Sequence, residues 1–375
     1  MEKSMGYRGA LRRGWTTGSC AAAAAQAAAA LLLTGRAPEA IRLQTPAGVV
    51  FTLPVEQSAL RDGTAVCAVR KDAGDDPDVT NGIRIFAHVQ KTMRGVTIEG
   101  GAGVGRVTKP GLSVPVGQAA INPGPRAQIE AAVRQAAGQA GYTGGFHIII
   151  AAENGAEVAG QTYNRHLGVM GGISILGTSG VVEPMSEKAL TDTIRLELDS
   201  VYAQGERTLL LCPGNYGADF AGDALGLDLE RAVKCSNFVG EALDHAAFRG
   251  FERILLAGHA GKLVKIAAGV MNTHSAAADG RQEIFAAHAA LCGAAQDTLE
   301  ALMQAVSVDA MVEALDAAGL RGPVCARIGA EMEKRLARRL NGRAQIEFVM
   351  FTNRYGVLAQ SRGAAALCSE LRKMR

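Results

Sequence analysis

The sequence is poor in aromatic residues. Phe, Trp and Tyr make up 5% of its 375 residues, and Trp occurs once. Modules that bind single-stranded nucleic acid rely on stacking against aromatic side chains, so the composition argues against that class. The net charge is also small, at +3, and no long basic run is present. Nucleic acid is therefore not expected as a partner, and the abundance of Gly and Ala favours an enzyme with many tight turns.

Cysteine pairs at disulfide or metal-binding spacing are absent as well. The seven cysteines are scattered, odd in number and never spaced as C-x-x-C: Cys20, Cys67, Cys212, Cys235, Cys292, Cys325 and Cys368. A disulfide framework or a zinc site would cluster them. We therefore expect reduced thiols, no protein-bound metal and a cytoplasmic protein.

A long hydrophobic run is missing too, although one segment resembles an export signal. "RRGWTTGSCAAAAAQAAAALLLTG" begins with two arginines, but the apolar residues 20–33 are fewer than the roughly 18 that span a bilayer. Thr16, Thr17 and Ser19 stand where helix N-caps belong, and Gly35 follows the run. The pattern predicts an internal helix and no membrane contact.

The chain is predicted to be an α/β protein with three parts. Residues 1–144 contain this helix, short alternating runs and a second helical segment, which predicts an α+β domain with a largely antiparallel sheet. In residues 145–280, apolar runs alternate with helical segments, which predicts a Rossmann-like, doubly wound parallel sheet. The strands expected there include "FHIIIAA", "ISILGTSG", "RTLLLCPGN" and "FERILLAGH", and "GKLVKIAAGVMN" is expected to be a helix. Residues 281–375 are predicted to form helices and a C-terminal hairpin, packed on the α/β domain.

A glycine-rich loop, "IEGGAGVGRVTKPG", carries Gly101, Gly103 and Gly105 after Glu99. Many S-adenosylmethionine enzymes place such an acidic-x-G-x-G-x-G pattern after a strand, because glycine lets the backbone approach a ligand. The prolines that follow argue against the helix that normally completes this motif. A glycine-rich turn between strands is the alternative, and both interpretations stay open.

Three further glycine-bearing motifs are expected at the carboxyl ends of parallel strands. They contain Gly177 and Thr178 in "GTSG", Gly214 and Asn215 in "CPGNYG", and Gly258 and His259 in "GHAGK". Ligands bind at this rim in open α/β sheets. The last motif lacks the Ser or Thr of a P-loop, which argues against a nucleotide-dependent kinase.

Three polar segments allow two interpretations each. "MNTHSAAAD" is compatible with metal binding or acid–base catalysis, and equally with a polar helix cap. Asn122 and Arg126 in "INPGPR" form either a rigid anion-binding turn or a helix entry. "KDAGDDPDVT" lacks calcium-loop spacing, and its aspartates either contact a cationic ligand or cap their own turn. No GxSxG elbow or HExxH pair supports a hydrolase.

Taken in order, these motifs resemble one family from about residue 11 to residue 281. "RRGWTTGSCAAAAA", "KDAGDDPDVTNG", "GGAGVGRVTKPGL", "AINPGPR", "GVMGGISILGTSGVVEP", "SNFVGEALD" and "GHAGKLVKIAAGVMNTHSAAAD" are similar to the cobalt-precorrin-5B C1-methyltransferases of anaerobic cobalamin biosynthesis. One departure is Asn81, where the family more often has His.

The resemblance implies that S-adenosylmethionine methylates carbon 1 of the cobalt-bearing macrocycle to give cobalt-precorrin-6A. The alternative is a non-catalytic corrinoid carrier or scaffold of the same pathway. The resemblance assigns no catalytic residue, and the sequence leaves open whether the protein is a homo-oligomer.

We assign candidate binding residues from this expected chemistry. The methyl donor carries a sulfonium and an ammonium, and its expected contacts are Asp72, Asp75, Gly177, Thr178, Gly214, Asn215, Gly258 and His259. The macrocycle carries many carboxylates, which favour cations and backbone amides. Its expected contacts are Arg12, Thr16, Thr17, Ser19, Gly101, Gly103, Lys109, Asn122 and Arg126.

Overall fold

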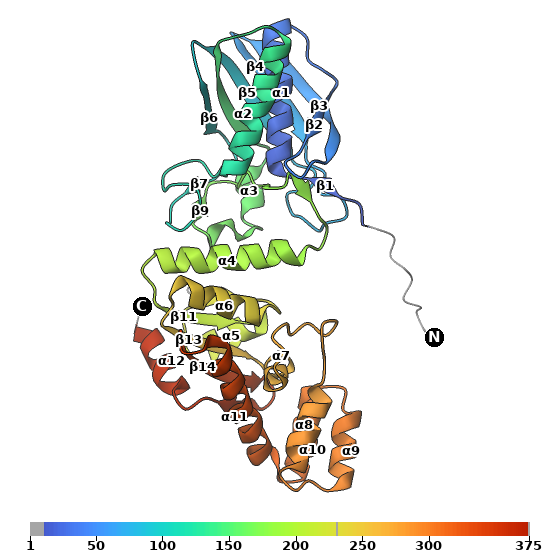
Figure 1. Cartoon of the computed structure of the whole chain (residues 1–375), viewed down its shortest axis with the longest axis vertical. Coiled ribbons are helices and arrows are strands. Elements are labelled where there is room, and N and C mark those ends of the chain that lie inside the picture. Colours follow the sequence, from blue (N-terminus) through green and yellow to red (C-terminus); the bar gives the residue numbers. More distant parts are fainter. Residues whose placement is uncertain (1–10, 230–231, 374–375) are drawn as a thin grey trace, which may run out of the picture. The chain divides into compact units, whose positions relative to one another are not determined.

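The computed structural model describes residues 11–229 and 232–373, apart from the side chains of Asn215 and Tyr216. The chain forms two compact units, Met1–Glu187 and Lys188–Arg375. The predicted α/β class is confirmed (Figure 1). The units divide after residue 187, whereas the change of sequence pattern predicts a boundary before residue 145.

The first unit contains a six-stranded sheet with the strand order β2-β3-β4-β5-β8-β6. All neighbours are antiparallel except β6 and β8, so the predicted largely antiparallel sheet is confirmed. The strands are β2 (Ala40–Gln44), β3 (Val50–Arg61), β4 (Thr64–Arg70), β5 (Arg84–Thr92), β6 (Val96–Gly100) and β8 (Gly145–Ala152).

Strand β8 corrects the sequence analysis, which assigns it to the parallel sheet. It lies between β5 and β6 in the first unit and pairs antiparallel with β5. The continuous apolar run "FHIIIAA" is typical of a strand with neighbours on both sides, in either kind of sheet. The run therefore identifies a central strand without identifying its partners.

Helices α1 (Thr17–Thr34) and α2 (Pro123–Gln139) pack side by side on this sheet (Figure 1). Thr16 caps α1 by accepting the N–H of Ser19, and Gly35 ends the helix at φ 75°. Alanine side chains leave α1 thin enough to approach both the sheet and α2, and Ala21 to Ala25 are fully buried. Helix α1 is long and apolar enough to cross a membrane by length and composition, yet 78% of it is buried inside the structure. The predicted internal helix is confirmed.

Short elements connect these parts at one end of the first unit. Strand β1 pairs with β10, and β7 pairs with β9. These elements are β1 (Gly14–Trp15), β7 (Arg106–Val107), α3 (Gly155–Ala159), η1 (Tyr163–Arg165), β9 (Val169–Met170) and β10 (Val181–Val182). The strand predicted at "ISILGTSG" is wrong, because Ile173 and Ile175 make only isolated bridges, to Val104 and Ile121.

The second unit contains a five-stranded sheet with the order β12-β11-β13-β14-β15. The first four strands are parallel and β15 is an antiparallel edge strand, so the predicted parallel sheet and C-terminal hairpin are confirmed. Numbered along the chain, this is the 2-1-3-4-5 order of flavodoxin-like sheets. The strands are β11 (Thr208–Cys212), β12 (Ala232–Lys234), β13 (Arg253–His259), β14 (Gln345–Thr352) and β15 (Gly356–Gln360).

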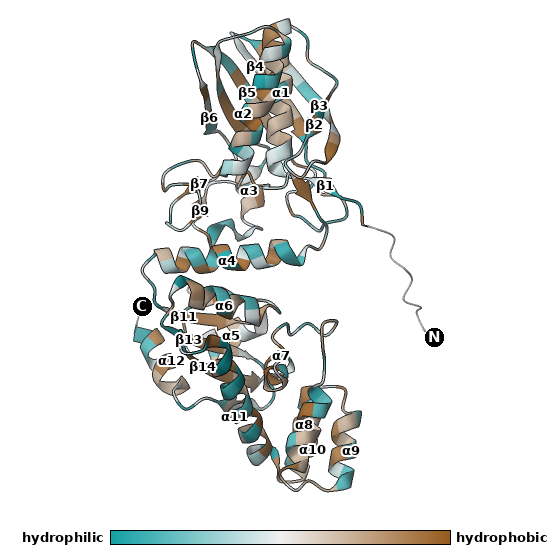
Figure 2. Cartoon of the chain, in the orientation of Figure 1, coloured by the Kyte–Doolittle hydropathy of each residue, from teal (hydrophilic) through white to brown (hydrophobic). Residues whose placement is uncertain are grey.

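Helices cover both faces of this sheet, which buries all five residues of β11, and four of these five are hydrophobic (Figure 2). One face holds α4 (Glu187–Ala203), α6 (Val239–Arg249), α7 (Ala260–Leu263) and α11 (Arg321–Leu340). The other face holds α5 (Asn215–Asp223) and α12 (Ala364–Lys373).

The remaining helices extend the first of these faces. The predicted helical segment is confirmed as α8 (Arg281–Ala290), α9 (Gln296–Gln304) and α10 (Val308–Ala317), which share a core with the sheet. The helix predicted at "GKLVKIAAGVMN" is shorter than expected. It consists of α7 and the 3-10 helix η3 (Val264–Ala268), and it ends where Gly269 adopts φ 82°.

Candidate functional site

The carboxyl edge of the second sheet contains a topological switch point between β11 and β13. Helix α5 follows β11 onto one face, and α7 follows β13 onto the other. The two connections diverge onto opposite faces of the sheet, and ligands bind between such neighbouring strand ends in open α/β sheets. The "CPGNYG" and "GHAGK" motifs form these two connections, as their sequence position predicts.

Glycines bring the two connections close together. A Cβ atom on Gly258 would lie 3.1 Å from Cδ of Pro213 and 3.0 Å from Cγ of Leu263. A Cβ atom on Gly217 would lie 2.8 Å from the carbonyl oxygen of Ala257. The structure therefore brings the predicted residues Gly214, Asn215, Gly258 and His259 to one edge of the sheet.

His259 is the N-cap of α7, and its Nδ1 accepts the N–H of Gly261 at 3.1 Å. Its ring stands edge-on to Phe351, with 5.7 Å between the ring centroids. Burial lowers the pKa of His259, and Asp309 opposes this shift. The ring is therefore neutral at pH 7.

Lys262 is a residue of this edge that the sequence analysis does not select. Its Nζ donates to the carbonyl oxygen of Ser236, after β12, at 3.2 Å. The same Nζ would lie 3.2 Å from a Cβ atom on Gly214, after β11. The ammonium thus stands among the ends of three strands. Its position in "GHAGK", four residues after the buried run of β13, is the signal that could have selected it.

The "MNTHSAAAD" segment is tied down by Lys265, whose side chain is 2% exposed. The Lys265 Nζ donates to the carbonyl oxygens of Thr273 at 3.2 Å and Ala278 at 2.9 Å. Asp279 is bound by Arg281 at 2.7 Å, at the start of α8. Among the described residues, no group of three His, Cys, Asp or Glu side chains is arranged to hold a metal ion.

Gly177 and Thr178 lie in the first unit, so their predicted place on the rim of the parallel sheet is wrong. The segment around them crosses the N-termini of α1 and α2. The N–H of Gly18 donates to the carbonyl oxygen of Leu176 at 2.8 Å. A Cβ atom on Gly177 would lie 2.1 Å from Oγ1 of Thr16, so glycine is required for this close approach.

The three hydroxyl residues at the start of α1 are buried and hydrogen-bonded within the protein. Thr16 Oγ1 accepts the N–H of Ser19 at 3.1 Å, and Thr17 Oγ1 accepts the N–H of Leu176 at 2.8 Å. Ser19 Oγ donates to the carbonyl oxygen of Gly180 at 2.8 Å. Their contacts hold residues 176–180 against the helix start, and their predicted contact with the substrate stays a prediction.

The glycine-rich loop makes its close backbone approach to strand β8. The N–H of Gly101 donates to the carbonyl oxygen of Ile150 at 2.8 Å. A Cβ atom on Gly103, whose φ is 75°, would lie 2.1 Å from the carbonyl oxygen of Ala152. The turn interpretation therefore accounts for both glycines within the first unit.

The carboxylates of the aspartate loop are occupied by neighbouring residues. Asp72 accepts two hydrogen bonds from the Arg12 guanidinium, at 2.6 and 2.8 Å, and Asp75 accepts the N–H of Arg12 at 2.6 Å. The Arg12 side chain lowers the pKa of Asp72, chiefly through these hydrogen bonds. Buried Lys71 pairs with Asp78 at 2.5 Å. The loop thereby fixes the segment that precedes α1.

The remaining predicted substrate contacts differ in how far their polar groups are hydrogen-bonded within the protein. Arg126 donates to the carbonyl oxygens of Ile121 at 2.9 Å and Ile98 at 2.8 Å, and burial lowers its pKa. Asn122 is the N-cap residue of α2 but makes no side-chain cap hydrogen bond. Lys109 packs its stem beside Gly168. Arg126 therefore supports the helix entry, whereas the side chain of Asn122 is not used as a cap.

Comparison with known proteins then decides the family. The model described as CbiD matches residues 5–184, and the model described as CbiD, C-terminal domain, matches residues 272–362. A cobalt-precorrin-5B C(1)-methyltransferase of Ruminiclostridium cellulolyticum is 48% identical over 92% of this chain and 89% of the relative. One of Alkaliphilus metalliredigens is 42% identical over 96% of this chain and 95% of the relative. The chain belongs to the CbiD family. The resemblance expected from its motifs is confirmed.

A crystal structure of a cobalamin biosynthesis protein (cbiD) from Archaeoglobus fulgidus is also similar to this CbiD chain. It is 32% identical, and it matches with a TM-score of 0.40 over 71% of this chain and 83% of that chain.

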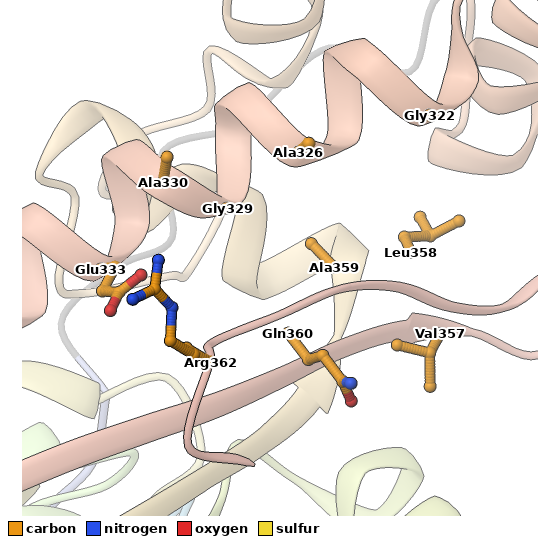
Figure 3. Close-up of a pocket in the computed structure, with 10 residues that line it drawn as sticks. All are labelled: Gly322, Ala326, Gly329, Ala330, Glu333, Val357, Leu358, Ala359, Gln360 and Arg362. Atoms are coloured by element: carbon orange, nitrogen blue, oxygen red, sulfur yellow. The ribbon is translucent and has the colours of Figure 1, made fainter. Parts of the chain in front are cut away.

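A groove of about 700 Å³ lies between α11 and edge strand β15, away from the CbiD motifs quoted above (Figure 3). Small residues of α11, among them Gly322, Ala326 and Gly329, form one wall. The charged groups of Glu333 and Arg362 face each other at one end (Figure 3). We do not assign the family's chemistry to this groove, because its walls offer no glycine-bearing strand end.

Proposed function

We propose that this chain transfers a methyl group from S-adenosylmethionine to carbon 1 of cobalt-precorrin-5B, giving cobalt-precorrin-6A. The observation that carries the proposal is 48% identity over 92% of the chain with a curated protein named for that reaction. The cobalt belongs to the substrate. Seven free thiols fit a reducing cytoplasm, which we propose as the location.

The reaction requires orientation more than acid–base catalysis. The bond between sulfur and the methyl carbon breaks, and its electron pair stays on sulfur. The macrocycle supplies the electrons of the new carbon–carbon bond and takes over the positive charge. Holding the sulfur, methyl and ring carbon in line can supply about 7–11 kcal/mol of barrier reduction. The protein's task is therefore to bind both reactants in register and to exclude water.

We propose that the methyl donor binds at the carboxyl edge of the second sheet. Gly214 places backbone without a side chain at the switch point, and only the Lys262 ammonium lies within 4 Å of its Cβ position, which suits the approach of a flat nucleoside. Neutral His259 does not repel the donor's sulfonium, because burial lowers the pKa of this histidine. The backbone of Asn215 begins α5 at the same edge.

We propose that the macrocycle contacts the first unit where the N-termini of α1 and α2 meet residues 173–180. Met170 and Leu176 are exposed there, at 47% and 45%. Arg106 pairs with Met170 across β7 and β9, and Lys109 lies beside Gly168. Apolar side chains flanked by cations match a ring with apolar faces and a carboxylate rim.

Mass spectrometry with a labelled donor tests the proposed function. The full chain is incubated with cobalt-precorrin-5B and S-adenosylmethionine that carries a ¹³C methyl group. We expect the macrocycle to gain one labelled methyl, together with an equal amount of S-adenosylhomocysteine. A folded protein that binds the macrocycle but neither methylates it nor binds S-adenosylhomocysteine would be a corrinoid carrier instead.

A further inference from the structure

Lys262 is a half-buried cation at the switch point between β11 and β13. Helix α7 carries it from the end of β13 across to the loops that follow β11 and β12. Its Nζ contacts the carbonyl oxygen of Ser236 and stands over the Cα of Gly214, as the two 3.2 Å separations show. A group bound between these loops would therefore meet the ammonium directly.

The charge of Lys262 is not balanced within the described part of the chain. An ammonium has three N–H donors, and the carbonyl of Ser236 takes one. By contrast, the buried lysines Lys71 and Lys265 each have a carboxylate nearby: Lys71 pairs with Asp78 at 2.5 Å, and Lys265 lies 3.8 Å from Asp279. No described carboxylate lies within 4.0 Å of the Lys262 ammonium. Burial lowers the pKa of Lys262, Cys235 opposes this shift, and the positive charge of Lys265 adds to it.

A half-buried charge without a counter-charge has lost part of its hydration, and a bound anion at this position would offset that cost. Both reactants of the proposed function carry carboxylates: the donor has one on its amino-acid end, and the macrocycle has several on its rim. A carboxylate can therefore be the bound anion, and no phosphate is required. The donor's sulfonium and ammonium would be repelled by Lys262, so only its carboxylate end suits this position.

We infer that Lys262 binds a carboxylate of one of the two reactants and thereby fixes that reactant at the switch point. This inference rests on the proposed function for the identity of the ligand. Lys262 would then bind only ligands that carry a carboxylate. Removing its ammonium should reduce the affinity for those ligands and not for analogues that lack the carboxylate.

Calorimetry with matched ligand pairs tests this role in the full chain. S-adenosylhomocysteine carries the donor's carboxylate, whereas 5′-methylthioadenosine lacks the amino-acid end. Cobyrinic acid carries free rim carboxylates, whereas cobinamide has amides in their place. Lys262→Met keeps the length of the side chain without its charge. Lys334→Met, on the exposed face of α11, is the control for loss of a lysine.

Loss of a charge-assisted hydrogen bond corresponds to more than about tenfold in affinity. We expect Lys262→Met to reduce the affinity for S-adenosylhomocysteine by that factor. Its affinity for 5′-methylthioadenosine should stay within about twofold of the parent's. A selective loss for cobyrinic acid over cobinamide would support the inference with the macrocycle as the source. Equal affinity changes within both pairs, or no change in either, would overturn it.

Two further measurements keep the result unambiguous. Lys262→Gln retains a donor for the carbonyl of Ser236 and tests the charge alone if the methionine variant unfolds. The unsubstituted parent protein is assayed for methyl transfer in parallel. If the parent does not methylate the macrocycle but Lys262→Met shows the carboxylate-selective loss, the proposed function is refuted and the Lys262 site stands.

Discussion

The guanidinium of Arg12 donates two hydrogen bonds, at 2.6 and 2.8 Å, to the carboxylate of Asp72, 60 residues further along the chain. Asp75 accepts the backbone N–H of Arg12, and the N–H of Trp15 donates to the carbonyl oxygen of Asp72. Two sequence motifs of the family thus form one structure. The aspartate loop holds the segment that leads into α1.

This arrangement predicts that the aspartate loop affects donor binding only weakly. Asp72→Asn removes the charge but keeps an acceptor for Arg12, and we expect its affinity for S-adenosylhomocysteine to stay within about twofold of the parent. Calorimetry in buffer with a chelator measures this. A loss of tenfold or more in a folded variant would show that Asp72 contacts the donor. Binding abolished by the chelator in the parent would show that a metal is required.

Gly74 and Gly82 form a matched pair for testing how the loop holds residues 12–15. Both adopt left-handed backbone, at φ 67° and 80°, which costs a non-glycine residue about 1–2 kcal/mol. A Cβ atom on Gly74 would lie 2.0 Å from the carbonyl oxygen of Arg12, whereas one on Gly82 meets nothing within 4 Å. We therefore expect Gly74→Ala to displace the segment and Gly82→Ala to leave it in place.

Trp15 reports this displacement, because it is the one tryptophan of the sequence and its Nε1 donates to the carbonyl oxygen of Arg70 at 3.0 Å. We expect a red-shifted fluorescence emission for Gly74→Ala and an unchanged spectrum for Gly82→Ala. Identical spectra for both variants would show that the loop yields without moving the segment.

Glu197 predicts a pH dependence of stability. Burial raises its pKa to about 7, while Lys234 opposes the shift. In the unfolded chain the pKa of a glutamate is about 4.3. Between these values the folded state keeps a proton that the unfolded state releases, so this group lowers stability as the pH rises from about 4.3 to about 7. Above pH 7 its destabilising contribution is constant.

The variant Glu197→Gln removes this contribution. The increase in its free energy of unfolding over that of the parent should be near zero at pH 4 and reach up to about 3 kcal/mol at pH 8. Urea unfolding of the full chain at both pH values measures the difference. Exposed Glu333, changed to Gln, is the control and should show the same difference at both. A gain for Glu197→Gln that does not vary with pH would contradict the raised pKa.

Local patterns predicted the elements of this fold better than the partners of each element. Helix α1 was predictable because its cap residue Thr16 and its terminal Gly35 lie next to it in sequence. Strand β8 was identified, but its neighbours β5 and β6 depend on contacts that the run "FHIIIAA" does not encode. The same limit explains Gly177, whose close partner Thr16 lies in a distant motif.

In the candidate site, the positions of the glycine motifs could be predicted from local sequence, but the partners of the charged side chains could not. The motifs at Gly214 and Gly258 follow buried apolar strands, so their place at the carboxyl edge was predictable. Lys262 was not selected, because its partner Ser236 lies 26 residues earlier and its missing counter-charge is a property of the folded edge. Arg126 was selected as a contact of the substrate, and the structure shows that it also donates to the carbonyls of Ile98 and Ile121.

Lys265 provides the last prediction, because it is the structural counterpart of Lys262. Its ammonium satisfies the carbonyl oxygens of Thr273 and Ala278, and its side chain is 2% exposed. Lys265→Met leaves two carbonyls without this donor, each at a cost of about 1–3 kcal/mol where no water replaces it. We expect a fall of at least about 2 kcal/mol in the free energy of unfolding and faster amide hydrogen exchange in residues 272–279. Lys334→Met should change neither. Unchanged exchange in the Lys265 variant would mean that the N–H of Thr273, which donates to the carbonyl oxygen of Asn237 at 2.9 Å, anchors this segment without the ammonium.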